Sequence, residues 1–115
     1  MSTSKRDFQV VSQRKIKNYA LQIARKFKPE KIILFGSYVT GKQTLESDVD
    51  FLVIFPQPVQ GLKKAVEIIK AFIPPFPIDL LVRSGEEVRV RLGLNDFFLQ
   101  EVIKTGKVLY ESSDS

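Results

Sequence analysis

Short apolar runs alternate with stretches of helical periodicity along this chain of 115 residues, and that alternation limits its possible folds. The runs cover residues 31–35, 49–55 and 78–82, and the first two end at Gly36 and Pro56. Runs of this length, rich in Val, Ile, Leu and Phe, predict buried β-strands. Strands separated by helices favour an α/β protein, in the broad sense that includes α+β, with helices packed on one sheet. A chain of this length is expected to form one domain.

Helical periodicity is the second local signal. The expected helices cover residues 12–27, 62–72, 84–92 and 95–105. In the first of them, apolar side chains stand at offsets of 3, 4, 7 and 11 from Ile16, which is typical of an amphipathic helix. Ser84 resembles the first residue of a capping box, and Asn95 is the expected N-cap of the last helix. Gly106 is its expected stop, and residues 108–110 are expected to add a short strand.

The chain holds no cysteine and no histidine. These absences exclude disulfide frameworks, thiol nucleophiles, zinc sites of the Cys/His type and Ser-His-Asp triads. Any catalysis must therefore use carboxylates, hydroxyls, lysine or arginine, with hard cations such as Mg²⁺. The longest apolar run, residues 51–55, is far shorter than the ~20 residues of a membrane span. The first seven residues lead into no apolar segment, so we expect no signal peptide. We expect a soluble, cytoplasmic protein that does not bind membranes.

Positive charge gathers in the first part of the chain. Residues 1–31 carry nine basic and two acidic side chains, a net charge of +7, while the remaining residues carry a net charge of −2. Such an asymmetry favours an acidic or polyanionic partner, and a solvated helix face explains it equally well. Direct nucleic-acid binding is the weakest alternative, because aromatic side chains do not interleave with the basic ones.

Three features point to chemistry on phosphates. Gly36 and Ser37 follow the first strand, where a glycine lets the backbone approach an anion closely. Asp48 and Asp50 open the second strand and share one of its faces, with Cα atoms about 6.5 Å apart. Asp79 lies within the third strand, where an isolated charge is unfavourable. If the second and third strands are neighbours, the three carboxylates converge.

Convergence of carboxylates has a cost that a metal ion removes. Two charges this far apart repel by about 2.5 kcal/mol at an effective dielectric constant near 20. A pair of divalent cations bridging the three carboxylates would relieve that repulsion and serve phosphoryl transfer. Each feature alone has an ordinary explanation: a turn for Gly-Ser, a cap or solvated pair for Asp-x-Asp, and a sheet edge for Asp79. Their combined spacing is more specific than any one of them.

The stretch of residues 36–50 resembles the signature of the DNA polymerase beta-like nucleotidyltransferase superfamily. Its elements are Gly-Ser, a second glycine at Gly41, and Ser-Asp-x-Asp at the start of a strand, with Asp79 matching the third acidic position. The chain length resembles that of the minimal nucleotidyltransferases of toxin–antitoxin modules, which pair with a HEPN-domain protein. The resemblance implies the nucleotidyltransferase fold, with one small mixed β-sheet, over residues 12–111. Residues 1–11 are expected to be a flexible N-terminus, and residues 112–115 a tail.

The resemblance also implies roles for individual residues. The implied nucleotide-binding residues are Gly36, Ser37, Lys42 and Ser47. Asp48 and Asp50 would bind two Mg²⁺ ions, with Mn²⁺ as a substitute, and Asp79 would bind the catalytic metal and help activate the acceptor hydroxyl. Many minimal members carry an arginine between the serine and the second glycine, where this chain has Tyr-Val-Thr at residues 38–40. Lys42 or a basic residue of a partner is the expected replacement.

The function expected from these observations is metal-dependent transfer of a nucleoside monophosphate from a triphosphate to an acceptor hydroxyl. ATP is the expected donor, and the implied acceptor is a tyrosine of a HEPN toxin, which the transfer would neutralise. The other expected partner is a second copy of this chain, in a homo-oligomer. The alternative is a binding module without catalysis, which would neutralise its partner by covering the partner's active site.

Overall fold

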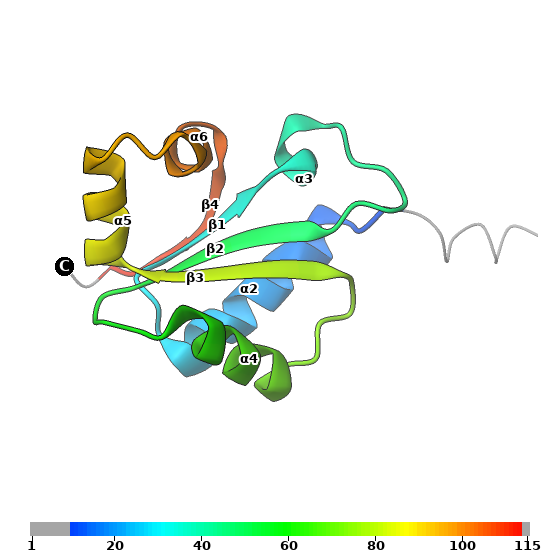
Figure 1. Ribbon diagram of the computed structural model, residues 1–115. Helices are drawn as coiled ribbons and strands as arrows, with labels where there is room; N and C mark the ends of the chain where they lie inside the picture. Colours follow the sequence, from blue (N-terminus) through cyan, green and yellow to red (C-terminus); the bar gives the residue numbers. More distant parts are fainter. Residues whose placement is uncertain (1–9, 114–115) are drawn as a thin grey trace, which may run out of the picture.

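A four-stranded mixed sheet forms the centre of the computed structural model, which describes residues 10–113 (Figure 1). The strands are β1 (Lys31–Phe35), β2 (Val49–Phe55), β3 (Ile78–Ser84) and β4 (Lys107–Glu111). Their order is β3-β2-β1-β4; β1 runs antiparallel to both β2 and β4, whereas β2 and β3 are parallel. The mixed sheet expected from the sequence is therefore confirmed, and β3 and β4 form its edges.

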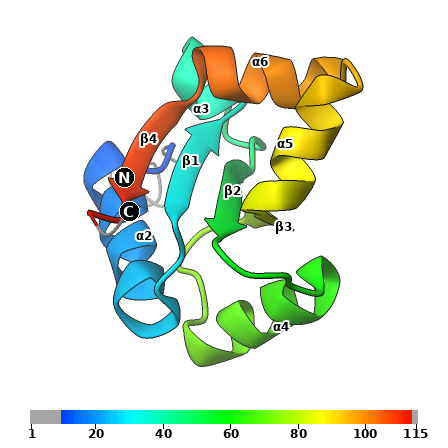
Figure 2. The ribbon, with the colours of Figure 1, turned by 90° about the vertical axis from the view of Figure 1, so that its left-hand side faces the viewer.

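Helices cover both faces of this sheet. They are α2 (Gln13–Phe27), α3 (Ser37–Thr40), α4 (Gly61–Ala71), α5 (Gly85–Gly93) and α6 (Phe97–Thr105). Helices α2 and α4 lie on one face, while α5 and α6 lie on the other (Figure 2). Helix α4 makes the crossover that two parallel strands require. No helix within residues 10–113 has both the length and the apolar character needed to cross a membrane.

Each face of the sheet has its own apolar core because side chains alternate along a strand. Phe51 and Val53 of β2 face α2 and α4, where Tyr19 is fully packed among them. Leu52 and Ile54 face α5 and α6. Because β2 is buried on both faces, its sequence is apolar at nearly every position. The only polar position within β2 is Asp50, at its start.

Helix ends follow the sequence signals with one correction. Ser84 accepts a hydrogen bond from the Glu87 N–H at 3.1 Å, so the predicted cap of α5 is confirmed. The predicted cap of α6 at Asn95 is wrong: Asp96 accepts the Leu99 N–H at 3.0 Å, whereas Asn95 has a φ of +63° and belongs to the preceding turn. Asparagine tolerates this left-handed conformation better than most residues.

Gly106 follows the end of α6, as predicted, but for a different reason. Its φ of −69° is accessible to any residue, so conformational freedom is not the requirement. A Cβ atom there would collide with the Val102 carbonyl and the Ile33 side chain, so glycine permits the close approach of α6 to β1.

The ends of the chain lie partly outside the described residues. Of the N-terminus expected to be flexible, residues 1–9 are not described, and of the expected tail, residues 114–115 are not described. Within the described part, the Val11 N–H donates to the Tyr38 hydroxyl at 3.1 Å. This bond ties the segment before α2 to α3.

Candidate active site

The strand pairing brings Asp50 and Asp79 side by side. They are register partners in the parallel pair β2 and β3, so their side chains lie on the same face, the one that carries α5 and α6. The Val49 N–H donates to the Pro77 carbonyl at 3.0 Å, which fixes the start of both strands at the same edge. Asp48 directly precedes β2 and is exposed. The expected neighbourhood of these strands is confirmed, at the right-hand end of the sheet in Figure 1.

Asp79 lies within β3, as the sequence predicts. β3 is an edge strand and Asp79 is exposed, so the sheet-edge explanation of this charge also applies. The ionised carboxylate therefore keeps most of its hydration, and its desolvation costs little free energy. An exposed carboxylate at the sheet edge is open to an incoming molecule, whereas Asp50 is half-buried.

Gly36 allows the backbone at the end of β1 to lie close to the Asp50 carboxylate. Its φ of +82° favours glycine, and a Cβ atom at this position would collide with Asp50 Oδ2. Both constraints exclude other residues, so the glycine is required for the turn and for the close approach. The backbone that follows is thereby held beside the acidic side chains.

A single helical turn, α3, begins at Ser37 directly after Gly36. The Gly36 carbonyl accepts the N–H groups of Val39 and Thr40 at 3.0 and 3.2 Å. Gly41, with a φ of +81°, ends the turn. The amides of Ser37 and Tyr38 head α3, and N–H groups in this position have no partner within the helix. They are oriented to favour an anion beside Gly36.

The loop between α3 and β2 gives Lys42 and Ser47 different surroundings. The Ser47 hydroxyl accepts the Thr44 N–H at 2.8 Å, so it holds the loop in shape. Lys42 is exposed, and its backbone N–H donates to the Ser37 carbonyl at 3.2 Å. The Lys42 backbone therefore adjoins the Gly-Ser turn, while the Ser47 hydroxyl already has a partner.

Tyr38 lies in the segment between Ser37 and Gly41. Its side chain is 5% exposed and belongs to the core cluster under α2. Its hydroxyl accepts the Val11 N–H, and its carbonyl accepts the Gln13 side-chain amide at 3.4 Å. Tyr38 thus anchors α3 to the start of α2, and it brings no positive charge to the turn.

The three carboxylates act on one another electrostatically. The pKa of the Asp50 carboxyl is raised from its ordinary value of 3.8 to about 6, first by burial and then by the charges of Asp79 and Asp48. Negative charges raise the pKa of a carboxyl group only when they are close to it. The three carboxylates are therefore near enough to repel one another. A cation bound among them would favour the ionised form instead.

The donor set suits Mg²⁺ or Mn²⁺, which bind carboxylate oxygens and keep positions for phosphate oxygens. Within residues 10–113, no three Asp or Glu side chains are arranged as a ready group for a metal ion. Holding one would require the side chains of Asp48, Asp50 and Asp79 to turn toward a common point. The strand register already places Asp50 and Asp79 side by side.

Two residues beside the acids were not identified from the sequence. Phe35 is the register partner of Asp50 across β1 and β2, so its ring lies on the same face. Phe98 of α6 meets that ring edge to face, with centroids 5.6 Å apart. Both residues stand beside recognisable signals in the sequence: Phe35 precedes Gly36, and Phe98 belongs to the pair of phenylalanines that begins α6. Their proximity to Asp50 depends on the pairing of β1 with β2, which the sequence does not reveal.

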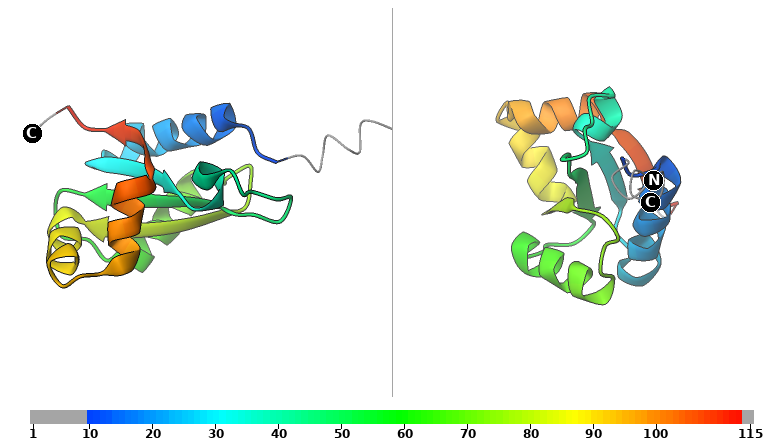
Figure 3. Two further views of the ribbon diagram at one scale, coloured as in Figure 1. Left: turned by 90° about the horizontal axis from the view of Figure 1, so that it is seen from above. Right: turned by 90° about the vertical axis from the view of Figure 1, so that its right-hand side faces the viewer.

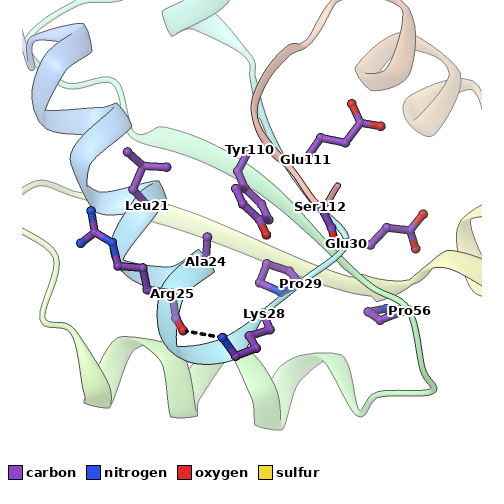
Figure 4. Close-up of a pocket in the computed structure, with 10 residues that line it drawn as sticks. All are labelled: Leu21, Ala24, Arg25, Lys28, Pro29, Glu30, Pro56, Tyr110, Glu111 and Ser112. Atoms are coloured by element: carbon purple, nitrogen blue, oxygen red, sulfur yellow. Dashed lines mark hydrogen bonds between the residues drawn. The ribbon is translucent and has the colours of Figure 1, made fainter. Parts of the chain in front are cut away.

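A hollow of about 860 Å³ lies at the opposite end of the sheet (Figure 4). It is lined by Leu21, Ala24, Arg25, Lys28, Pro29, Glu30, Pro56, Tyr110, Glu111 and Ser112. Its basic and acidic side chains balance, and none of the predicted site residues contributes to it. The hollow is therefore separate from the acidic cluster.

Comparison with known proteins decides which family these features belong to. The family model described as a nucleotidyltransferase domain matches residues 16–107, most of the chain. The chain belongs to this family. The nucleotidyltransferase expected from the sequence is therefore confirmed as such, and the acidic residues and the Gly-Ser turn all fall inside the matched range.

One curated relative of this nucleotidyltransferase comes from Methanocaldococcus jannaschii and is named "putative protein adenylyltransferase". The two are 33% identical over 71 residues, which cover 61% of this chain and 72% of the relative. This identity and coverage place both proteins in the same family.

Two solved structures resemble the nucleotidyltransferase in fold. One is a toxin–antitoxin complex with AMP-PNP, at 24% identity and a TM-score of 0.58, covering 84% of this chain and 74% of that chain. The other is a Shewanella oneidensis complex of a tri-AMPylated HEPN toxin with an MNT antitoxin, at 21% identity and a TM-score of 0.53, covering 88% and 74%. The expected nucleotidyltransferase fold is confirmed by these likenesses.

Proposed function

We propose that this nucleotidyltransferase transfers AMP from ATP to a hydroxyl group of a partner protein, and that the partner is a HEPN-domain toxin. The observation that carries the proposal is the register of Asp50 with Asp79, with Gly36 pressed against Asp50. These contacts put two carboxylates and an anion-favouring turn at one end of the sheet, where the triphosphate and the acceptor hydroxyl would meet.

The proposed roles follow from exposure and position. Ser37 and the amides at the start of α3 hold the terminal phosphates, and Lys42 adds charge from the adjoining loop. Asp48, Asp50 and Asp79 would hold divalent cations, which neutralise the phosphate charges. Ser47 contributes through the shape of its loop, because its hydroxyl already bonds Thr44.

Asp79 is assigned to the acceptor because it is exposed at the sheet edge. The acceptor oxygen forms a bond to the α-phosphorus, and the bond from that phosphorus to the bridging oxygen breaks. Pyrophosphate leaves, and Asp79 takes the proton of the acceptor hydroxyl. Positioning and charge neutralisation supply most of the rate enhancement in such transfers.

Support for a protein acceptor comes from the relatives. The curated relative bears the name of a protein adenylyltransferase, and the Shewanella oneidensis complex contains an AMPylated HEPN toxin. One sheet and its covering helices account for most of residues 10–113. The acceptor surface is therefore proposed to come from a second protein. The proposed domain is residues 12–111.

The direct test is intact-mass spectrometry of the candidate HEPN protein after incubation with ATP, Mg²⁺ and the nucleotidyltransferase. The wild-type chain should add the mass of AMP to the partner. Asp79→Asn should lower the rate by about 100-fold or more, because the variant cannot take the proton. Glu86→Gln, which removes an exposed charge at the start of α5, is the matched control and should behave as wild type.

The same samples, assayed also for the activity of the toxin, separate the enzyme from a binding module. If wild type and Asp79→Asn both neutralise the toxin fully and neither leaves a covalent adduct, catalysis is not the function. The proposal then fails, and neutralisation by complex formation replaces it.

A further inference from the structure

A half-exposed aromatic pair flanks the acidic residues of the nucleotidyltransferase. Phe35 sits opposite Asp50 in the antiparallel pair β1 and β2, and Phe98 of α6 meets the Phe35 ring at an interplanar angle of 83°. Seen from above, α6 crosses the strands on this face of the sheet (Figure 3). The Phe98 side chain is 51% exposed. An aromatic ring thus faces solvent beside the acidic end of the sheet.

The packing of α6 does not require this ring. Leu99 and Val102 attach the helix to the sheet, with exposures of 2% and 3%. Phe98 lies outside that buried cluster and contacts Phe35, itself only partly buried. Single exposed apolar side chains are common on protein surfaces, and what distinguishes this ring is its position beside the acidic residues. The edge-to-face contact fixes the Phe98 ring and leaves part of its surface open.

Two adjacent contacts link the Phe98 ring to Asp50. Side chains opposed across antiparallel strands stand about 5 Å apart, and the Phe35 and Phe98 ring centroids are 5.6 Å apart. These steps limit the separation of the Phe98 ring from Asp50 to roughly 15 Å at most, which a nucleoside can span. A nucleotide whose α-phosphate lies at Asp50 can place its base on that ring.

We propose that Phe98, supported by Phe35, is the stacking platform for the base of the bound nucleoside triphosphate. The inference rests on the proposed function, because it requires the phosphates to lie at Gly36 and Ser37. Bases stack on aromatic side chains through their π-faces, and this contact accepts any base. The platform thus positions the nucleoside and favours triphosphates over inorganic polyphosphate.

Two ligands, one with a nucleoside and one without, provide the test. AMP-PNP and inorganic tripolyphosphate are titrated calorimetrically, with Mg²⁺, into wild type, Phe98→Ala, Phe98→Trp and Phe97→Ala. Phe98→Ala should weaken AMP-PNP binding roughly 5- to 100-fold, the range for losing one stacked base, and leave tripolyphosphate binding unchanged. Phe98→Trp should restore AMP-PNP binding. Phe97, 79% exposed and one residue away on the helix, is the matched control, and its variant should bind both ligands as wild type does.

Other outcomes overturn the proposal in distinguishable ways. Equal loss of both ligands in Phe98→Ala and Phe98→Trp would mean that the ring only supports the fold. Unchanged AMP-PNP binding with slower AMP transfer to the partner would assign Phe98 to the protein surface instead. In both cases the proposed function stands. If wild type binds neither ligand, the phosphate site and the proposed function fail together with the platform.

Discussion

Gly36 shows how one residue sets the geometry of the site. Its φ of +82° and the contact that a Cβ atom would make with Asp50 Oδ2 leave no room for another side chain. The Gly-Ser turn therefore stands against a carboxylate that is itself half-buried. Ser37 and Asp50, on either side of this contact, provide the predictions at the residue scale.

Ser37→Ala should weaken triphosphate binding without loss of stability. Gly36, not Ser37, is the N-cap of α3, so removal of the hydroxyl does not uncap the turn. The loss of a hydrogen bond to a charged phosphate should cost about 1–3 kcal/mol of binding free energy. Calorimetry with AMP-PNP and thermal melting measure the two effects, with Thr40→Ala at the other end of α3 as control. A large drop in melting temperature with unchanged binding would make Ser37 a purely structural residue.

Asp50→Asn should change how the stability of the metal-free protein depends on pH. The folded-state pKa of about 6 exceeds the ordinary value of 3.8, so the folded protein retains the proton to higher pH than the unfolded chain. The stability from this proton is complete below the ordinary value and is lost as pH rises through about 6. Wild type should lose on the order of 2 kcal/mol over this range, and Asp50→Asn should not.

Urea unfolding in the presence of EDTA, at several pH values on both sides of that range, checks the prediction. Asp79→Asn is the comparison: it removes only one neighbouring charge, so it should reduce the pH dependence without abolishing it. Parallel stability curves for wild type and Asp50→Asn would contradict the electrostatic account.

At the scale of elements, helix caps decide where the segments around the site begin. Asp96 caps α6 through the Leu99 N–H and also stands 3.4 Å from Arg91. Asp96 thus fixes the first turn of the helix that carries Phe98, while Asn95 provides the left-handed residue before it.

Asp96→Ala should therefore lower the free energy of unfolding by about 1 kcal/mol. Asp96→Ser keeps a capping oxygen and should recover most of that loss, which separates the cap from the ion pair with Arg91. Asn95→Gly should cost little, because glycine adopts the positive φ easily. Chemical denaturation measures all three variants, and a greater loss for Asn95→Gly than for Asp96→Ala would reverse the assignment.

The elements differ in how far the sequence alone predicts them. Strands β1 and β2 have the predicted bounds, because apolar runs closed by Gly36 and Pro56 are strong local signals. The position of Asp79 at an edge was only one of the alternatives, because the strand order depends on how distant segments pair. Phe98 was missed for the same reason. Asn95 and Asp96 both suit an N-cap, and only the backbone conformation distinguishes them.

In the whole molecule, the candidate site lies at one end of the sheet, and helices cover both faces of that sheet. The acidic end remains accessible, since Asp48 and Asp79 are exposed there. Helix α2 carries much of the excess positive charge, and its outer residues Arg14, Lys15 and Lys17 are exposed. An acidic partner surface for this helix stays a prediction.

The most direct test of the account is calorimetric titration of AMP-PNP with and without Mg²⁺. Wild type should bind only when the metal is present, and chelation by EDTA should abolish binding, because the repelling carboxylates must be neutralised before they accept phosphates. Asp48→Asn/Asp50→Asn should lose this metal-dependent binding. The double variant Glu86→Gln/Glu111→Gln removes as much charge elsewhere and should retain it. Equal binding by wild type and Asp48→Asn/Asp50→Asn would contradict the central claim that these carboxylates form the metal and triphosphate site.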